Sequence, residues 1–274
     1  MKLLDGSELV GYIKERQLKQ VRALRLSWRV IPKLAIIQTI DNPVIDTYVR
    51  LKKAYGEDIE VEVEHYKITQ ADLMQTIDTL NSDESVMGII IQLPLEDISQ
   101  TDEAVKAVSQ SKDVDGLGEG TDFTPATAMA IDWLLAGYNV ELHGKIISII
   151  GNGRLVGSPL YNLWSEQGLN VQVYDRNSDI SSVVSSSDIV VTATGVPRLI
   201  NADMVKPGTV VVDAGSASES GKIIGDVDDD VRSLDDITIT PLKGGVGPLT
   251  VAALFDNVIR SARRIADIKG QQDL

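Results

Sequence analysis

The fold is decided by residues 146–157, which read IISIIGNGRLVG. The apolar start is typical of a buried strand, and the glycines that follow are spaced G-x-G-x-x-x-G, one residue longer than the common dinucleotide fingerprint. Gly151 permits a tight turn, Gly153 lets the backbone approach a pyrophosphate, and Gly157 permits close packing of helix on strand. The stretch therefore predicts a strand, a nucleotide-binding turn and a helix.

Two further segments are expected at the same edge of the sheet. Asp175 ends the next predicted strand, where a carboxylate can accept hydrogen bonds from a ribose and favours NAD over NADP by repelling a 2′-phosphate. Arg176 is adjacent and could instead bind such a phosphate, and a plain turn residue is the alternative interpretation of Asp175. A third strand ends in a small-residue loop, Thr194 and Gly195. The residues that we predict to bind the cofactor are Gly151, Asn152, Gly153, Val156, Asp175, Arg176, Thr194 and Gly195.

Apolar runs alternate with helical patterns along the whole chain. The predicted strands are 33–40, 60–68, 86–92, 145–150, 171–174, 188–194, 209–214 and 237–240. The predicted helices are 7–26, 44–55, 70–80, 102–108, 126–136, 158–167, 180–186 and 251–266. Helix-length connections between strands indicate parallel sheets covered by helices. We predict an α/β protein with two α/β domains and a cleft between them: residues 1–119, completed by the C-terminal helix within 251–274, and a Rossmann-type nucleotide-binding domain over 120–250.

Composition excludes several classes of function. The chain has 274 residues, 43% of them hydrophobic, which is enough for a sizeable core, and a net charge of -14, which disfavours general nucleic-acid binding. No apolar run is long enough for a transmembrane helix, and the first residues turn polar too soon for a signal peptide. Cysteine is absent and only two histidines occur, so we predict no metal site and a cytoplasmic location. The acidic run 226–230 is interpreted as a solvated loop rather than a cation site.

The first half of the chain carries candidates for chemistry. Tyr48 and Lys52 are four residues apart on a predicted helix and share one face, and Gln92 ends an apolar strand, where side chains point into a ligand crevice. A partly desolvated lysine beside an amide can act as an acid or base near neutral pH, and Asp115 can accept two N–H groups from a heterocycle. Taken singly, each also fits a structural role: a solvated lysine, a core tyrosine, or Asp113 or Asp115 as a cap.

Residues 243–250, KGGVGPLT, lie between a short apolar run and a helical pattern. Glycines there let peptide groups approach a flat ligand, and the N–H groups of a helix N-terminus would face it. The alternative is a tight loop that lets the last helix pack.

These motifs occur together in one family. Residues 48–52 (YVRLK), 92–95 (QLPL), 112–116 (KDVDG) and 244–250 (GGVGPLT) have its order and spacing, and 41–43, 156–159, 225–227 and 240–241 add to the match. The chain resembles the bifunctional methylenetetrahydrofolate dehydrogenase/methenyltetrahydrofolate cyclohydrolase family over nearly its whole length. The resemblance implies hydride transfer from 5,10-methylenetetrahydrofolate to NADP or NAD, then hydrolysis of the methenyl product to 10-formyltetrahydrofolate. It also implies a cytoplasmic homodimer that serves one-carbon metabolism and purine biosynthesis.

The resemblance implies roles for individual residues. Lys52 matches the catalytic lysine of cyclohydrolysis, Tyr48 the aromatic residue that packs on the folate, and Gln92 the amide that tunes the lysine. Asp115 matches the carboxylate that grips the pterin ring. The residues expected to line the cleft for folate and cofactor are Gly245, Val246 and Thr250.

Several positions depart from the family pattern. Ile45 replaces a serine, Phe123 a cysteine and Lys243 a proline, and the segment between 116 and 124 is shorter than usual. Asn152 replaces an arginine associated with the NADP 2′-phosphate, so with Asp175 we hypothesise a shift towards NAD or a weakened dehydrogenase. The alternatives are a cyclohydrolase with weak or absent dehydrogenase activity, another two-domain dehydrogenase of the shikimate or amino-acid type, and a non-catalytic nucleotide-sensing or scaffold protein.

Overall fold

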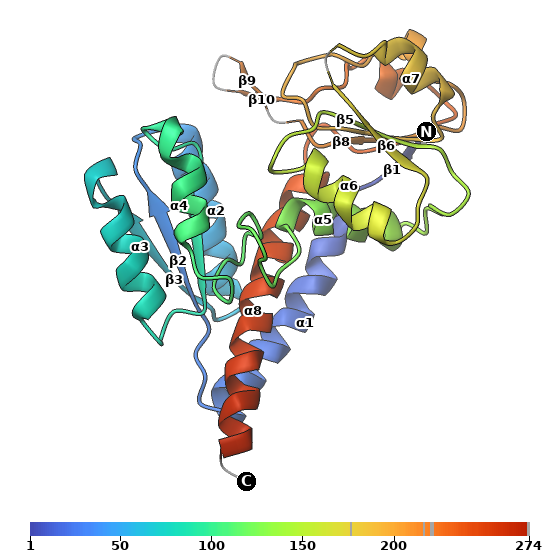
Figure 1. The fold of residues 1–274 in the computed structure, drawn as a ribbon. Coiled ribbons are helices and arrows are strands. Elements are labelled where there is room, and N and C mark those ends of the chain that lie inside the picture. The colour runs from blue at the N-terminus through green and yellow to red at the C-terminus, as the bar shows by residue number, and fades with distance from the viewer. Residues whose placement is uncertain (176, 216, 220–221, 273–274) are drawn as a thin grey trace. The chain divides into compact units, whose positions relative to one another are not determined.

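The chain divides into two compact units, each built on a parallel sheet. The computed structural model describes residues 1–175, 177–215, 217–219 and 222–272 (Figure 1). We call Gly11–Ala126 with Val251–Leu274 the three-stranded unit, and Met1–Val10 with Thr127–Thr250 the six-stranded unit. The prediction of two α/β domains is confirmed. Within the described ranges, no helix has the length and apolar character needed to cross a bilayer.

The three-stranded unit has helices on its sheet. The strand order is β3-β2-β4, and both pairs are parallel. The strands are β2 (Lys33–Gln38), β3 (Glu62–Lys67) and β4 (Gly88–Ile91). The helices are α1 (Gly6–Ser27), α2 (Pro43–Asp58), α3 (Leu73–Ser82), α4 (Thr101–Ala107) and α8 (Val246–Gln272), of which α1 and α8 begin in the six-stranded unit, and the 3-10 turns are η1 (Gln70–Asp72) and η2 (Ile98–Gln100).

Helices bury the apolar runs of this sheet. Alternate residues of β2 and β4 pack against α3 and α4 in one cluster that includes Ile37, Ile89 and Ile77. The intervening residues are buried as well, since Leu34 is 0% exposed, which is why these strands read as unbroken apolar runs instead of alternating patterns. On α2, Tyr55 stacks on Phe255 of α8 with ring centroids 5.1 Å apart.

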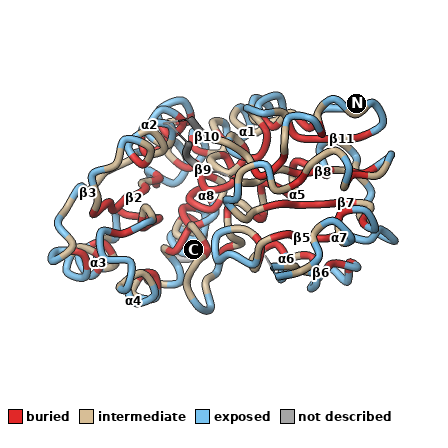
Figure 2. Tube along the Cα trace, turned by 90° about the horizontal axis from the view of Figure 1, so that it is seen from above, coloured by how far each residue is buried: buried red, intermediate tan, exposed pale blue. Residues whose placement is uncertain are grey.

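The six-stranded unit has the strand order β1-β11-β8-β7-β5-β6, and every pair is parallel. Its strands are β1 (Lys2–Leu3), β5 (Ile147–Ile150), β6 (Val171–Tyr174), β7 (Ile189–Thr192), β8 (Val210–Asp213) and β11 (Thr238–Ile239), beside the hairpin of β9 (Ala217–Glu219) and β10 (Lys222–Ile224). Its helices are α5 (Ala126–Gly137), α6 (Gly157–Glu166) and α7 (Ile180–Ser186), with the 3-10 turns η3 (Ala202–Met204) and η4 (Val231–Ser233). Figure 2 shows β5 and β7 as buried strands, and the two middle residues of β8 are buried as well. The register pairs Ile150 with Thr192 and Thr192 with Asp213, so the carboxyl ends of the three central strands share one edge.

Every predicted strand and helix is present, but three details differ. The sequence analysis missed β1, β9 and β10, which are only two or three residues long. Because β1 pairs with β11, residues 1–10 lie in the six-stranded unit rather than with residues 11–119. The last helix begins at Val246 instead of residue 251, since glycine and proline are tolerated in a first helical turn.

Candidate functional site

Helix α2 carries two of the predicted catalytic residues, and its start is fixed by a cap. The side chain of Asn42 accepts hydrogen bonds from the N–H groups of Val44 (2.9 Å) and Ile45 (3.4 Å), and Pro43 occupies the first turn. Ile45, which replaces the usual serine, is 4% exposed and belongs to the core. The cap therefore sets where Tyr48 and Lys52 fall along the helix.

Gln38 joins the first turn of α2 to the sheet. This fully buried amide follows the apolar run of β2 and donates from Nε2 to Asp46 Oδ1 (2.9 Å) and to the Ile40 carbonyl (2.8 Å). Its Oε1 lies 2.8 Å from Nε2 of His65 on β3. The sequence analysis missed Gln38, although the signal that identified Gln92, a polar amide at the end of an apolar strand, is present here too.

Lys52 and Gln92 meet, as the sequence predicts. The Lys52 ammonium group donates to Gln92 Oε1 at 2.6 Å. Gln92 follows β4, and its backbone N–H donates to the carbonyl of Ile37 at 2.8 Å, so the amide is held at the carboxyl end of the sheet. Burial lowers the pKa of Lys52, and the nearby Asp115 carboxylate opposes this by raising it. The lysine therefore loses its proton more readily than a solvated lysine does.

Asp115 lies in a loop that its neighbour Asp113 holds in shape. Asp113 is 4% exposed and accepts from the N–H groups of Gly116 (3.2 Å), Leu117 (3.4 Å) and Gly118 (2.7 Å). Of the two acids, Asp113 is the cap. Burial raises the pKa of Asp115, while the charge of Lys52 lowers it. The structure thus places an acid and a base of altered proton affinity in one electrostatic environment.

Helix α8 fastens the loop that carries Asp115. The Asn257 amide donates to the carbonyls of Val114 and Thr124, each at 2.9 Å, and so joins the two ends of the loop. Phe123, where the family pattern has cysteine, is 3% exposed, and the Arg264 guanidinium lies 4.9 Å from its ring centre. The sequence analysis missed Asn257, because nothing near it in the sequence indicates partners so far away.

Tyr48 lies one turn before Lys52 on α2 and is half-buried. Burial raises the pKa of its hydroxyl, so the group stays protonated at neutral pH and offers a neutral aromatic face.

Lys112, by contrast, is structural: its ammonium group donates at 2.7–2.9 Å to the last carbonyls around α3, those of Leu80, Asn81 and Asp83.

The glycine turn after β5 has the geometry that its spacing predicts. Gly151 adopts a φ of 105°, and a side chain at Gly157 would overlap the Gly151 carbonyl oxygen. Gly153 faces open space. Helix α6 begins at Gly157, and Val156 gives its N-terminus no side-chain cap. In the first turn of α6 the N–H of Ser158 donates to the Gly153 carbonyl at 3.1 Å and Pro159 has no N–H, so the glycine turn and the N–H of Gly157 are the groups that fit the pyrophosphate of a dinucleotide.

Asp175, which follows β6, and Asn152, in the glycine turn after β5, are both exposed. The Asp175 carboxylate accepts from the backbone N–H of Asn177 at 2.8 Å, and this bond lowers its pKa. The acid is therefore charged at neutral pH. Arg176, the other predicted cofactor residue here, lies outside the described residues.

The loop after β7 is shaped by an acid that the sequence analysis misread. Thr194 donates its backbone N–H and its hydroxyl to Asp226 Oδ2, at 2.6 Å and 2.9 Å. Asp226 is fully buried, so the interpretation of residues 226–230 as a solvated loop is wrong at its first residue: the carboxylate satisfies donors from the neighbouring strand. Gly195 follows, exposed and with a φ of 69°.

The glycine stretch before α8 packs against the start of α1. Gly244 has a φ of 88°, and its carbonyl accepts the N–H of Ser7 at 2.9 Å. A side chain at Gly6 would overlap the Gly245 carbonyl. Close packing therefore accounts for part of this motif. Val246 is 6% exposed and accepts the Thr250 hydroxyl at 3.3 Å, while Lys243 is exposed. A ligand role for Gly245, Val246 and Thr250 stays a prediction.

Both halves of the chain match the domains of one family. Residues 4–115 match the catalytic domain, and residues 125–266 the NAD(P)-binding domain, of tetrahydrofolate dehydrogenase/cyclohydrolase. The chain belongs to this family. The bifunctional protein FolD of Campylobacter jejuni is 39% identical over 279 residues, which cover 96% of this chain and 99% of that protein.

Solved structures of the tetrahydrofolate dehydrogenase/cyclohydrolase family have the same fold as this chain. The crystal structure of bifunctional FolD from Campylobacter jejuni has a TM-score of 0.90 at 37% identity and covers 97% of this chain and 99% of that one. The Trypanosoma brucei FolD structure, complexed with NADP cofactor and inhibitor, has a TM-score of 0.89 at 29% identity, with 96% and 97% covered. Membership in this family excludes the alternative that the chain is a two-domain dehydrogenase of the shikimate or amino-acid type.

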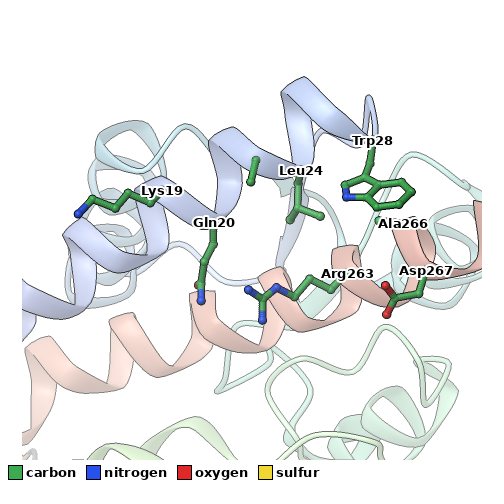
Figure 3. A pocket seen from close by; sticks show the side chains of 8 residues that line it. Lys19, Gln20, Leu24, Trp28, Arg263, Ala266 and Asp267 are labelled. Atoms are coloured by element: carbon green, nitrogen blue, oxygen red, sulfur yellow. The ribbon is translucent and has the colours of Figure 1, made fainter. Parts of the chain in front are cut away.

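A cavity of about 520 Å³ in the three-stranded unit is lined by none of the predicted site residues of this tetrahydrofolate dehydrogenase/cyclohydrolase. Figure 3 shows its lining from α1 and α8: Lys19, Gln20, Ala23, Leu24, Trp28, Arg263, Ala266 and Asp267. Because exposed charged side chains form much of this lining, we assign it no ligand.

Proposed function

We propose that this chain oxidises 5,10-methylenetetrahydrofolate with a nicotinamide cofactor and hydrolyses the methenyl product to 10-formyltetrahydrofolate. The observation that carries the proposal is the 2.6 Å hydrogen bond between Lys52 and Gln92, in a setting where burial lowers the lysine pKa. Membership in the family supplies both reaction types. We assign catalysis to Lys52, Gln92, Asp115 and Tyr48.

The hydrolysis follows from these groups. Water adds to the methenyl carbon that bridges N5 and N10, and the neutral Lys52 amine takes a proton from that water. The bond from the carbon to N5 then breaks, and N5 recovers a proton as the formyl group stays on N10. Gln92 orients the amine by accepting its N–H, Asp115 accepts N–H groups of the pterin, and Tyr48 packs on the ring.

The first experiment compares two adjacent lysines. Lys52→Ala is expected to lower the cyclohydrolase kcat by about 100-fold or more, the usual contribution of a general acid–base group, while folate binding persists. Lys53→Ala is the matched control, because Lys53 is exposed on the same helix. Steady-state hydrolysis and calorimetric titration with folate measure the two effects. An equal loss of binding and turnover would make Lys52 structural.

For the cofactor, which accepts the hydride when bound, we propose NAD over NADP. The support is the charged Asp175 at the end of β6 and the exposed, neutral Asn152 where the family pattern has arginine. The glycine turn and the start of α6 would hold the pyrophosphate. Asp175→Ala should weaken NAD more than NADP in paired assays with 5,10-methylenetetrahydrofolate. No change in either KM would remove Asp175 from the ribose site.

A cyclohydrolase with weak dehydrogenase activity is the second candidate, favoured by the same loss of charge at Asn152. Methenyl hydrolysis without cofactor reduction in those assays would establish it. We also propose a homodimer, for which β6 offers an edge strand, and light scattering tests it. A cytoplasmic location stays a prediction, to be tested by cell fractionation.

A further inference from the structure

Asp226 is a buried carboxylate to which neither proposed reaction gives a role. Its Oδ2 accepts from the Thr192 hydroxyl at 2.7 Å, from the Thr194 N–H at 2.6 Å and from the Thr194 hydroxyl at 2.9 Å. Its Oδ1 has no hydrogen-bond partner among the described residues and lies where a side chain at Gly215 would stand. A buried charge is retained at a cost, so its contacts indicate its purpose.

Those contacts fix the backbone where the chain leaves β7. Thr192 is the last residue of the strand, and Thr194 begins the loop. The Thr194 hydroxyl also accepts the N–H of Val196 at 3.0 Å. Since the N–H and the hydroxyl proton of Thr194 both go to Asp226, this threonine has no donor left for a ligand. Its predicted contact with the cofactor stays a prediction, and the bonds to Asp226 give this threonine a role in shaping the loop as well.

Asp226 is itself held in place by Asp213, at the end of β8. Asp213 accepts from the N–H groups of Asp226 (3.0 Å) and Val227 (3.2 Å) and from the Arg232 guanidinium (3.3 Å). A side chain at Gly225 would overlap the Asp213 carboxylate, so the two segments are in close contact. The backbone that carries Asp226 is therefore held by several hydrogen bonds that require no ligand.

The loop that begins at Thr194, after β7, is in contact with the glycine turn after β5. A side chain at Gly151 would meet the Ala193 carbonyl oxygen and, at 3.2 Å, the Thr194 methyl group. A displacement of Thr194 would therefore change the space beside the turn that we assign to the pyrophosphate. We propose that Asp226 is a positioning residue for the nicotinamide cofactor, acting through Thr194; this inference rests on the cofactor site proposed above.

The test measures KM for NAD and NADP together with cofactor-free methenyl hydrolysis, which depends on residues of the other unit. Asp226→Ala is expected to raise the cofactor KM by about tenfold or more, since hydrogen bonds to a charged group are the strong ones, and to leave hydrolysis within about twofold. Asp226→Asn keeps an acceptor at the same place and should restore most of the affinity. Thr192→Val is the matched control: it removes one bond to the same carboxylate but leaves the loop attached.

Thr194→Val keeps the inference testable if Asp226→Ala does not fold, because it deletes one hydroxyl from a half-buried position. A rise of about threefold in cofactor KM, reversed by Thr194→Ser, supports the proposal. A wild-type cofactor KM for Thr194→Val would overturn it, as would a wild-type cofactor KM for a folded Asp226→Ala variant or equal effects of Thr192→Val and Thr194→Val. Absence of cofactor reduction by the wild-type protein would instead refute the proposed dehydrogenase.

Discussion

Replacing Asn257 should loosen the loop that carries Asp115. The Asn257 side chain is fully buried, and its amide donates to the carbonyls of Val114 and Thr124, each at 2.9 Å. Asn257→Leu preserves the approximate volume but removes both donors. A buried acceptor left without a partner costs about 1–3 kcal/mol. Because the bond to Thr124 is only partly buried, we expect a total loss of about 2–4 kcal/mol in the free energy of unfolding.

Ser261→Ala is the matched control on the same helix. Its hydroxyl donates a single, longer bond, 3.2 Å to the carbonyl of Ser111, so the loss should be about 0.5–1.5 kcal/mol. Urea unfolding followed by circular dichroism measures both changes, and steady-state assays measure KM for the folate substrate. The Leu variant should raise that KM with little change in cofactor KM, because the loop positions Asp115 and not the glycine turn.

Equal unfolding free energies for Asn257→Leu and Ser261→Ala would refute this role of the Asn257 amide. It would also fail if Asn257→Leu lost stability but kept the wild-type folate KM, since the amide would then support the helix and not the loop. Asn257→Asp adds a pH test. A protonated acid can donate to one carbonyl whereas a carboxylate cannot, so folding raises the Asp pKa and stability should fall as pH rises through that folded value.

Three shorter predictions follow from the same structure. Gly157→Ala should abolish cofactor binding because its methyl group overlaps backbone in the turn, whereas Gly11→Ala on α1, which meets no atom within 4 Å, should retain binding within about threefold; fluorescence titration with NAD decides. Because burial lowers the pKa of Lys52, folding is disfavoured wherever the unfolded lysine is protonated, so Lys52→Met should unfold at a higher temperature than wild type near neutral pH. The difference between the two melting temperatures should narrow as pH rises towards the ordinary lysine pKa, which a series of thermal melts at increasing pH measures. Arg232→Met should cost about 3–5 kcal/mol by leaving the Asp213 carboxylate unpaired. Because burial raises the Asp213 pKa, urea titrations should show this loss growing as pH rises through that pKa.

The sequence allowed the architecture to be predicted because its signals are local. Most strands of the two sheets are short apolar runs, and most of these runs are followed by a helical pattern. The meeting of Lys52 and Gln92 was also predictable, since one lies on a helix face and the other at a strand end. The same strand-end rule would have found Gln38, had it been applied to β2.

The residues that the sequence did not reveal have hydrogen-bond partners far away in the chain. Asp226 holds groups 32 and 34 positions away, and Asn257 holds carbonyls 133 and 143 positions away. No periodicity or motif encodes such pairs, because they depend on where separate elements come together. The strand β1 was missed because it has only two residues and because its partner β11 lies near the opposite end of the chain.

The acids of this protein differ in how far their oxygens are satisfied. Asp113 accepts three backbone N–H groups and Asp226 accepts three donors, so the protein itself offsets the cost of burying them. Asp115 is different, because burial is the main cause of its raised pKa and Lys52 offsets it only in part. A carboxyl group left short of donors gains most from a ligand that supplies N–H groups, as a pterin does. Asp113 and Asp226, which each accept three donors, therefore shape the loops, and Asp115 is placed to bind.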